Sequence, residues 1–302
     1  MFCNGFGPVL GTTVWPSPIF PKVIFMPDFP LATSTSYFAG VLRGLPDSKG
    51  QQMVKDYLLE FETEGAKDTE SKKIKKARIP ILMYHNIDEW GWYDSALARR
   101  FKIPAAALET HLEYISENYQ VISMQDIYDY LTNGIELPEN PIVLTFDDGW
   151  KGVYDYAYPI LERYNLPFTI YLIASHYEQK DGYLSKEQIQ EMLDSGLAEL
   201  GNHTMHHPML GNFFDKEMIK KEIKDAQNQM QKDFGVRPKT FSYPGGSYNK
   251  IVLETLEEMG FKTAVTVNAG AQQSSNELLL LKRIGVDGAD TVEMLEKKLE
   301  IK

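Results

Sequence analysis

Cysteine is nearly absent from this chain of 302 residues, which contains only Cys3. A single cysteine excludes an internal disulfide and a thiolate metal site, and it leaves the redox compartment open. Basic residues are also in deficit, because 31 lysines and arginines face 42 aspartates and glutamates, for a net charge of −11. The electrostatic footprint of a nucleic-acid-binding protein is therefore missing. Such a surface would attract a cationic partner, although acidic proteins are common for solubility alone.

Long apolar runs are missing near the start, where residues 5–45 mix aromatic residues, prolines and glycines without a helical or alternating period. They lack the basic start of a signal peptide and the roughly 18 unbroken apolar residues of a membrane span, so we expect no integral membrane segment. They are either the remnant of a clipped export signal or a segment that packs on the domain. Residues 51–61 are predicted to form a short amphipathic helix. Residues 62–78 are mostly charged and are predicted to form a solvated linker. We interpret residues 1–77 as an N-terminal extension and residues 78–302 as one α/β domain.

Candidate strands and helices alternate from residue 79 onward. Strands are predicted at 79–83, 120–123, 142–146, 168–173, 199–201, 240–243, 263–267 and 282–286, and helices at 105–117, 124–133, 152–164, 185–195, 216–234 and 249–259. Ser185 and Gln188 form a predicted capping box at the start of one helix. Alternating βα units require parallel strands joined by right-handed crossovers, so the sheet either curls into a barrel or stays open with helices on both faces.

Two adjacent aspartates, Asp147 and Asp148, follow the apolar run 141–144. Neighbouring carboxylates at the end of a buried strand repel each other unless a cation or a proton intervenes. We therefore expect one of them to bind a metal ion and the other to be free for proton transfer. Half of the chain's six histidines, His203, His206 and His207, follow another candidate strand. One aspartate and two imidazoles make a three-ligand site with an open position for water, as hydrolytic metal centres require.

In order and in type, these residues resemble the motifs of the polysaccharide deacetylases, also called the NodB-homology or carbohydrate esterase 4 family. The motifs are Thr-Phe-Asp-Asp-Gly at 145–149, His-Thr-x-x-His at 203–207 and Phe-Ser-Tyr-Pro-Gly-Gly at 241–246. Together with residues 81–85 and 281–286, the third motif looks most like the branch that acts on poly-β-1,6-N-acetylglucosamine. The resemblance runs from about residue 79 to the C-terminus and implies a distorted (β/α)7 barrel.

By that resemblance, Asp147 is the general base, and Asp148, His203 and His207 hold a divalent metal ion. Zinc is favoured because its ligands here are imidazoles and a carboxylate. The family spacing favours His207 over its rival His206, whose alternative role is that of a surface or supporting residue.

Two features of the family are missing. Position 242 carries a serine where many members have an arginine, which leaves the partner of the base open, and no histidine follows His207 to serve as the family's usual acid. His85 ends the first core strand, which could neighbour the last strand in a closed barrel, so we predict that it protonates the leaving amine rather than being purely structural. Arg283 either orients a carboxylate from the neighbouring strand or forms a surface salt bridge. The backbone N–H of Gly245 is the family's candidate donor to the oxyanion.

The resemblance implies a hydrolase that removes N-acetyl groups from an N-acetylglucosamine polysaccharide, outside the cytoplasm or at the cell envelope. Sibling activities are those of an O-acetyl xylan esterase and a peptidoglycan deacetylase. A different class is a non-catalytic glycan-binding protein on the same scaffold. The base beside the metal ligands favours the enzyme, because a binding module has no use for it.

Other aromatic and histidine side chains have no motif to assign them. Trp150 and the loop residues 90, 92 and 93 either stack on sugar rings or fill small core pockets. His111 and His176 are expected to be structural or surface residues.

Overall fold

The structure is a computed structural model that describes residues 74–92 and 94–300 in full, and of residues 1–73 the backbone of several short strands. The chain divides into two compact units, Met1–Lys73 and Ile74–Lys302. Tyr93, one of the loop aromatics considered for sugar stacking, lies outside the described residues.

The described strands of the first unit pair in an antiparallel manner. Strand β4 (Ser36–Val41) pairs with β1 (Phe2–Cys3) and with β5 (Tyr57–Glu62), and β2 (Thr13–Trp15) pairs with β3 (Lys22–Ile24). The helix predicted over residues 51–61 is therefore wrong for its second half, while residues 51–56 lie outside the described part. All six residues of β5 have a partner on β4. Such pairing overrides the weak propensity of so short a helix, which is marginal by itself.

The charged segment that was predicted to be a linker ends in a strand of the second unit. Strand β6 (Lys76–Arg78) pairs antiparallel with β16 (Gln272–Ser274). The linker interpretation is wrong for these three residues, because their backbone is held by a sheet.

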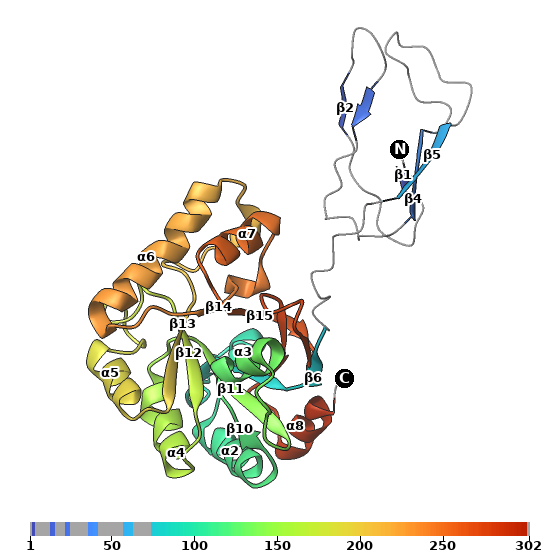
Figure 1. The fold of residues 1–302 in the computed structure, drawn as a ribbon. Coiled ribbons are helices and arrows are strands. Elements are labelled where there is room, and N and C mark those ends of the chain that lie inside the picture. The colour runs from blue at the N-terminus through green and yellow to red at the C-terminus, as the bar shows by residue number, and fades with distance from the viewer. Residues whose placement is uncertain are drawn as a thin grey trace. The chain divides into compact units, whose positions relative to one another are not determined.

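Parallel strands close into a barrel in the second unit (Figure 1). Around the barrel the order is β11 (Pro141–Asp148), β12 (Phe168–Leu172), β13 (Ala198–Asn202), β14 (Thr240–Ser242), β15 (Thr263–Ala269), β17 (Leu281–Gly285) and β7 (Ile81–Tyr84). Strand β7 pairs with both β17 and β11, which closes the ring, and β10 (Gln120–Val121) adds to the start of β11. The predicted distorted (β/α)7 barrel is confirmed, as is the predicted contact between its first and last strands.

Helices surround the barrel (Figure 1). They are α1 (Ala96–Phe101), α2 (Ala105–Asn118), α3 (Met124–Asn133), the π-helical turn η1 (Val153–Ala157) leading into α4 (Tyr158–Arg163), α5 (Lys186–Asp194), α6 (Lys216–Phe234), α7 (Lys250–Glu258) and α8 (Val292–Leu299). The predicted capping box is confirmed at the start of α5, where Ser185 and Gln188 each bond the other's backbone N–H. Helices α1 and α8 were not predicted.

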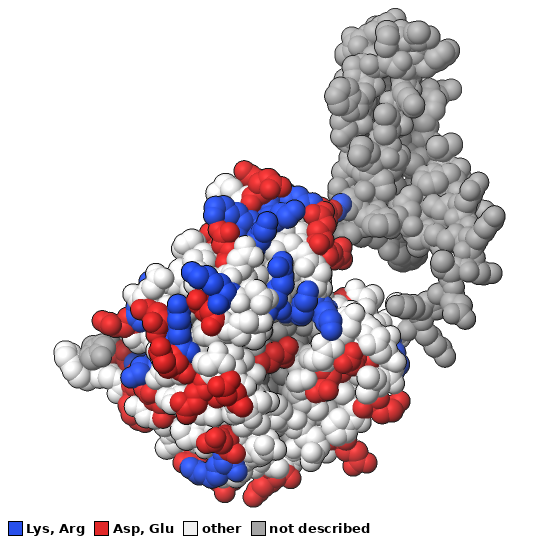
Figure 2. All heavy atoms as spheres, turned by 60° about the vertical axis from the view of Figure 1, so that its left-hand side comes forward, with Lys and Arg blue, Asp and Glu red and all other residues white. Residues whose placement is uncertain are grey.

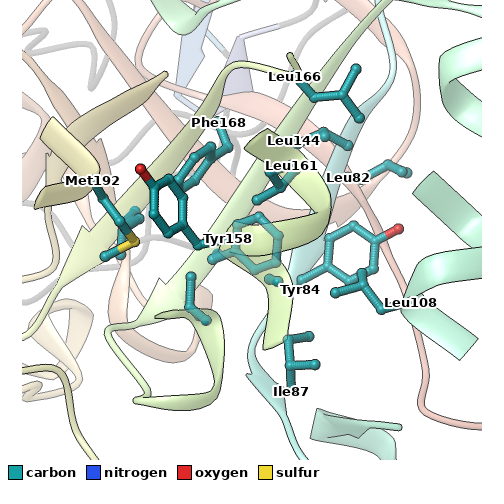
Figure 3. Packing of buried hydrophobic residues seen from close by; sticks show 14 of the residues in the cluster. Leu82, Tyr84, Ile87, Leu108, Leu144, Tyr158, Leu161, Leu166, Phe168 and Met192 are labelled. Carbon is teal, nitrogen blue, oxygen red and sulfur yellow. The ribbon is translucent and has the colours of Figure 1, made fainter. Parts of the chain in front are cut away.

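The main core lies between the barrel and the helices. In Figure 3, Leu82 and Leu144 of adjacent strands lie near Leu108 of α2 and Leu161 of α4. Residues 142–147 of β11 are all buried. Because strands of a barrel are covered on both faces, they appear in the sequence as unbroken apolar runs.

The outer surface carries both signs of charge. In Figure 2, lysines and arginines lie among aspartates and glutamates over the visible face of the second unit. In the part of the chain that the structure describes, we find no helix with the length and apolarity needed to cross a membrane.

Candidate metal and catalytic site

The predicted site residues meet at the C-terminal ends of the barrel strands, the face on which barrel enzymes carry their active sites. Asp147 and Asp148 end β11, and His203 directly follows β13. A cavity of about 890 Å³ is lined by all seven of the predicted residues, Asp147, Asp148, His85, His203, His207, Gly245 and Arg283. The closed ring of parallel strands thus brings together residues that lie far apart in the sequence.

Three side chains form a group that could hold one metal ion. Asp148 Oδ1 lies 3.4 Å from His203 Nε2 and 3.6 Å from His207 Nε2, and the candidate ligand atoms of the three residues all lie within 4.8 Å of one another. Ligand atoms about 2.1 Å from a tetrahedral zinc ion are separated by roughly 3.4 Å. The spacing of these atoms therefore fits a single ion.

Neighbouring groups orient the two imidazoles. His203 is 2% exposed, and its Nδ1 lies 2.8 Å from the carbonyl oxygen of Ser242. A proton on Nδ1 donates to that carbonyl, which leaves the Nε2 lone pair for a metal. The backbone N–H of His207 donates to Thr204 Oγ1 at 2.9 Å. Asp148, Thr204 and His207 all have positive φ angles, of 76°, 67° and 62°, so the backbone itself is strained to present these side chains.

His206 points away from this group. Its Nδ1 lies 2.9 Å from Glu222 Oε1, its backbone N–H donates to Glu222 Oε2 at 3.1 Å, and its side chain is 63% exposed. The structure thus places His207, and not its neighbour, beside Asp148 and His203.

Asp147 is held by Arg283 in a bidentate ion pair. The guanidinium donates from Nη1 to Oδ1 and from Nη2 to Oδ2, both at 2.7 Å, and Ser242 Oγ donates to Oδ2 at 3.1 Å. Arg283 is 1% exposed, so its alternative role in a surface salt bridge is wrong. It also donates to Thr145 Oγ1 and to the carbonyl of Thr266. Arg283 thus orients a carboxylate, which was the other of its two predicted roles. The prediction that this carboxylate comes from the neighbouring strand is wrong, because β7 lies between β17 and β11.

Both carboxylates are ionised at neutral pH. Burial favours the neutral acid, but the charge and hydrogen bonds of Arg283 hold the pKa of Asp147 below its ordinary value. Burial also opposes the charge of Asp148, yet without a metal ion the hydrogen bond and charge of the protonated His203 hold the pKa of Asp148 well below the usual range. The two neighbours differ in their partners, because Asp147 has the fixed positive charge of Arg283 whereas Asp148 faces imidazoles. A cation is therefore best accommodated at Asp148.

His85 lines the same cavity, just beyond the end of β7. Its ring meets that of Phe101 edge-on, with centroids 4.8 Å apart. Burial lowers the pKa of His85 by more than Asp147 and Asp148 raise it. Arg283 and His203 lower the pKa of His85 further, because their positive charges disfavour a protonated imidazole.

Gly245 belongs to the 3₁₀ turn η3 (Pro244–Gly246), which contributes to the cavity wall. Its φ of 55° is unfavourable for any residue with a side chain, and a Cβ there would lie 2.6 Å from Met209 Sδ. The turn thus depends on a glycine at this position.

Sequence reasoning missed the role of Trp150 in this arrangement. Its Nε1 donates to Asp148 Oδ2 at 2.9 Å, and its ring stacks on Tyr183 with centroids 4.4 Å apart. The only signal available was its place directly after the aspartate pair. His111 is fully buried and lies 2.9 Å from the carbonyl oxygen of Asp290, as a structural residue would, and the ring of His176 packs edge-on against Tyr183.

The loop aromatics Trp90 and Trp92 do not contribute to the cavity wall in the part of the chain that the structure describes. Trp90 Nε1 donates to the carbonyl of Lys102 at 2.8 Å, and Trp92 is 92% exposed.

The chain is similar in sequence to known polysaccharide deacetylases. Residues 134–264 match the family model described as polysaccharide deacetylase. Over 216 residues the chain is 30% identical to YxkH of Bacillus subtilis, which is named for the polysaccharide deacetylases, and the match covers 71% of this chain and 74% of that protein. Over 251 residues it is 24% identical to the poly-β-1,6-N-acetyl-D-glucosamine N-deacetylase of Staphylococcus epidermidis, with 76% of this chain and 86% of the relative covered.

Solved structures have the same fold. The deacetylase PplD of Streptococcus pyogenes, in complex with acetate, has a TM-score of 0.69 and 29% identity, and the match covers 75% of this chain and 100% of that one. IcaB from Ammonifex degensii has a TM-score of 0.65 and 24% identity, with 74% of this chain and 97% of that chain covered.

Proposed function

Since this chain belongs to the polysaccharide deacetylase family, we propose that it is a metal-dependent hydrolase that removes N-acetyl groups from an N-acetylglucosamine polysaccharide. The observation that carries the proposal is the cluster of Asp148, His203 and His207 ligand atoms next to an ionised, buried Asp147. The substrate class follows the similarity to the Staphylococcus epidermidis enzyme. From the family resemblance, we further propose that the reaction takes place outside the cytoplasm or at the cell envelope.

The metal would be held by Asp148 Oδ1, His203 Nε2 and His207 Nε2, and zinc suits this mixture of imidazole and carboxylate ligands. When bound, such an ion supplies a Lewis acid for the acetamide carbonyl and makes water more acidic.

Asp147 is the proposed general base. A carboxylate offers about four lone-pair positions. Oδ2 accepts hydrogen bonds from Arg283 and Ser242, whereas Oδ1 accepts from Arg283. Oδ1 therefore keeps an acceptor position for the proton of the attacking water. Its low pKa makes Asp147 a weak base that is fully ionised at neutral pH, which suits a water whose acidity has already been raised.

Two other residues complete the proposed mechanism. The backbone N–H of Gly245 donates to the oxyanion that forms as the carbonyl carbon is attacked. His85, which shares the cavity, gives a proton to the leaving amine nitrogen as the C–N bond breaks. Because burial lowers the pKa of His85 in the free protein, this role requires that the bound substrate raise it. The products are acetate and a glucosamine residue.

The test is acetate release from N-acetylglucosamine oligomers, measured with the purified enzyme as prepared, after treatment with a chelator, and after zinc is added back. We expect chelation to abolish release and zinc to restore it. An acetylated xylan oligomer in parallel separates an O-acetyl esterase from an N-deacetylase. Binding of oligomers without any acetate release would instead support the non-catalytic alternative.

A further inference from the structure

The indole of Trp150 contacts the carboxylate that is the proposed metal ligand. Asp148 Oδ2 accepts from Trp150 Nε1 at 2.9 Å, while Oδ1 faces His203 Nε2 and His207 Nε2 at 3.4 and 3.6 Å. The two oxygens of one carboxylate therefore have different partners, with a hydrogen-bond donor on one side and the imidazoles on the other.

Trp150 is itself fixed by contacts that involve no metal ligand. Its ring stacks on that of Tyr183 at an angle of 22°, and the two residues form an antiparallel bridge. Backbone hydrogen bonds on either side of this bridge join Lys151 N to Gly182 O at 2.8 Å and Leu184 N to Gly149 O at 3.0 Å. The loop after β11 is thus tied to the segment 182–184, and the indole N–H is held in place before a metal binds.

A carboxylate without such a donor has considerable rotational freedom, because the last torsion of an aspartate side chain has a broad profile. Rotation would bring Oδ2 toward the imidazoles or would let both oxygens bind one ion. Either change would disrupt the three-ligand geometry. Binding through both oxygens would also occupy the coordination position that a water molecule needs.

We propose that Trp150 is a positioning residue for the metal, whose indole N–H holds Asp148 so that Oδ1 alone faces His203 and His207. The inference rests on the proposed function, since it presupposes the metal site. The groups that orient metal ligands typically contribute 10- to 100-fold to metal affinity. An effect of that size is expected here.

The test is a zinc titration in competition with a chromogenic chelator, using the full chain as wild type, Trp150→Phe, Trp90→Phe and His203→Ala. Phenylalanine keeps an aromatic ring against Tyr183 but removes the N–H donor. Trp90 is the matched control, because its indole also bonds an oxygen, the carbonyl of Lys102, and does not line the cavity. We expect roughly 10- to 100-fold weaker zinc binding for Trp150→Phe, unchanged affinity for Trp90→Phe and no binding at this site for His203→Ala. In the Co²⁺-loaded Trp150→Phe protein, the visible spectrum should also change, because the coordination geometry changes.

A second measurement uses the wild-type protein and so does not depend on the folding of a variant. In ¹⁵N-labelled protein, one of the indole N–H signals should shift as zinc is added, and that signal should be absent from the Trp150→Phe spectrum.

The outcomes separate the two claims. Zinc affinity of Trp150→Phe within twofold of wild type, an equal loss in Trp90→Phe, or no indole shift on zinc addition would overturn the role of Trp150 alone. Failure of the wild-type protein to bind zinc would overturn the proposed function, and this inference with it.

Discussion

Replacing Arg283 by Met should destabilise the barrel, because it leaves the carboxylate of Asp147 buried without its positive partner. The pair has two contacts of 2.7 Å, and both side chains are at most 4% exposed. With charge centres about 4 Å apart and an effective dielectric constant of 20, the Coulomb energy is about 4 kcal/mol. Breaking a buried pair by removing one partner typically costs 3–5 kcal/mol, so the two approaches agree.

The coupling energy between Arg283 and Asp147 can be measured with a double-mutant cycle. The free energy of unfolding is determined by urea denaturation for the wild type, Arg283→Met, Asp147→Asn and the double variant. The double variant should be more stable than Arg283→Met, since removing the orphaned charge relieves the penalty. The loss in Arg283→Met should be largest near pH 8 and should shrink toward pH 5. In the wild type, the ionised Asp147 contributes stability above its unfolded pKa of 3.8, because its pKa is lower in the folded protein. Without Arg283, the buried negative charge is costly, and the carboxyl group avoids this cost by taking up a proton as the pH falls.

The rate should respond as well, because the guanidinium also aims the base. A catalytic group that is misplaced by about 1 Å can lower the rate roughly 10²-fold. We therefore expect the Arg283→Met variant to release acetate at least that much more slowly than the wild type. A destabilisation below about 1 kcal/mol at pH 8, or effects of the two single variants that simply add, would refute the idea that Arg283 compensates the charge of Asp147.

Further predictions concern other residues of the barrel. His207→Ala should lose most bound zinc and activity while His206→Ala keeps both, and a metal-content assay with the reverse result would show that the wrong histidine was chosen. His85→Ala should slow release from N-acetyl substrates by roughly 10²- to 10⁴-fold but affect an acetyl ester with a good leaving group far less; equal losses on both would rule it out as the acid. Burial raises the pKa of Glu199 to about 7, so its neutral form is favoured in the fold and stability is lost as the pH rises from 4.5 through 7. Glu199→Gln should therefore be more stable than wild type at pH 8, by up to about 3 kcal/mol, with no gain at pH 4, and equal stability at pH 8 in urea denaturation would count against that pKa shift.

Much of the barrel could be predicted because its strands and helices have clear periodic patterns. Helices α3 and α6 begin and end at the predicted residues, and each predicted strand is present with bounds shifted by a few residues. The missed helices are short or lie at the end of the chain. Helix α1 has no buried residue and so presents no apolar stripe, and α8 buries only Leu295 and Leu299.

The site was predictable where one motif contains several of its residues, and less so where contacts join distant strands. The aspartate pair and the histidine motif were found from local spacing. The contact of Arg283 with Asp147 joins β17 to β11, which are not adjacent in the barrel, so no spacing in the sequence encodes it. The hydrogen bond of Trp150 depends on a loop turned by the positive φ angles of Asp148 and Gly149, which is likewise invisible in composition.

Zinc content and acetate release, measured together on one preparation of Asp147→Asn, test the proposed mechanism most directly. The amide has the size of the carboxylate but cannot take the proton from water, and Asp148, His203 and His207 remain intact. The account predicts one zinc ion per chain, as in wild type, and no acetate release from N-acetylglucosamine oligomers. Loss of zinc together with activity would place Asp147 among the metal ligands, and acetate release near the wild-type rate would contradict its role as the base.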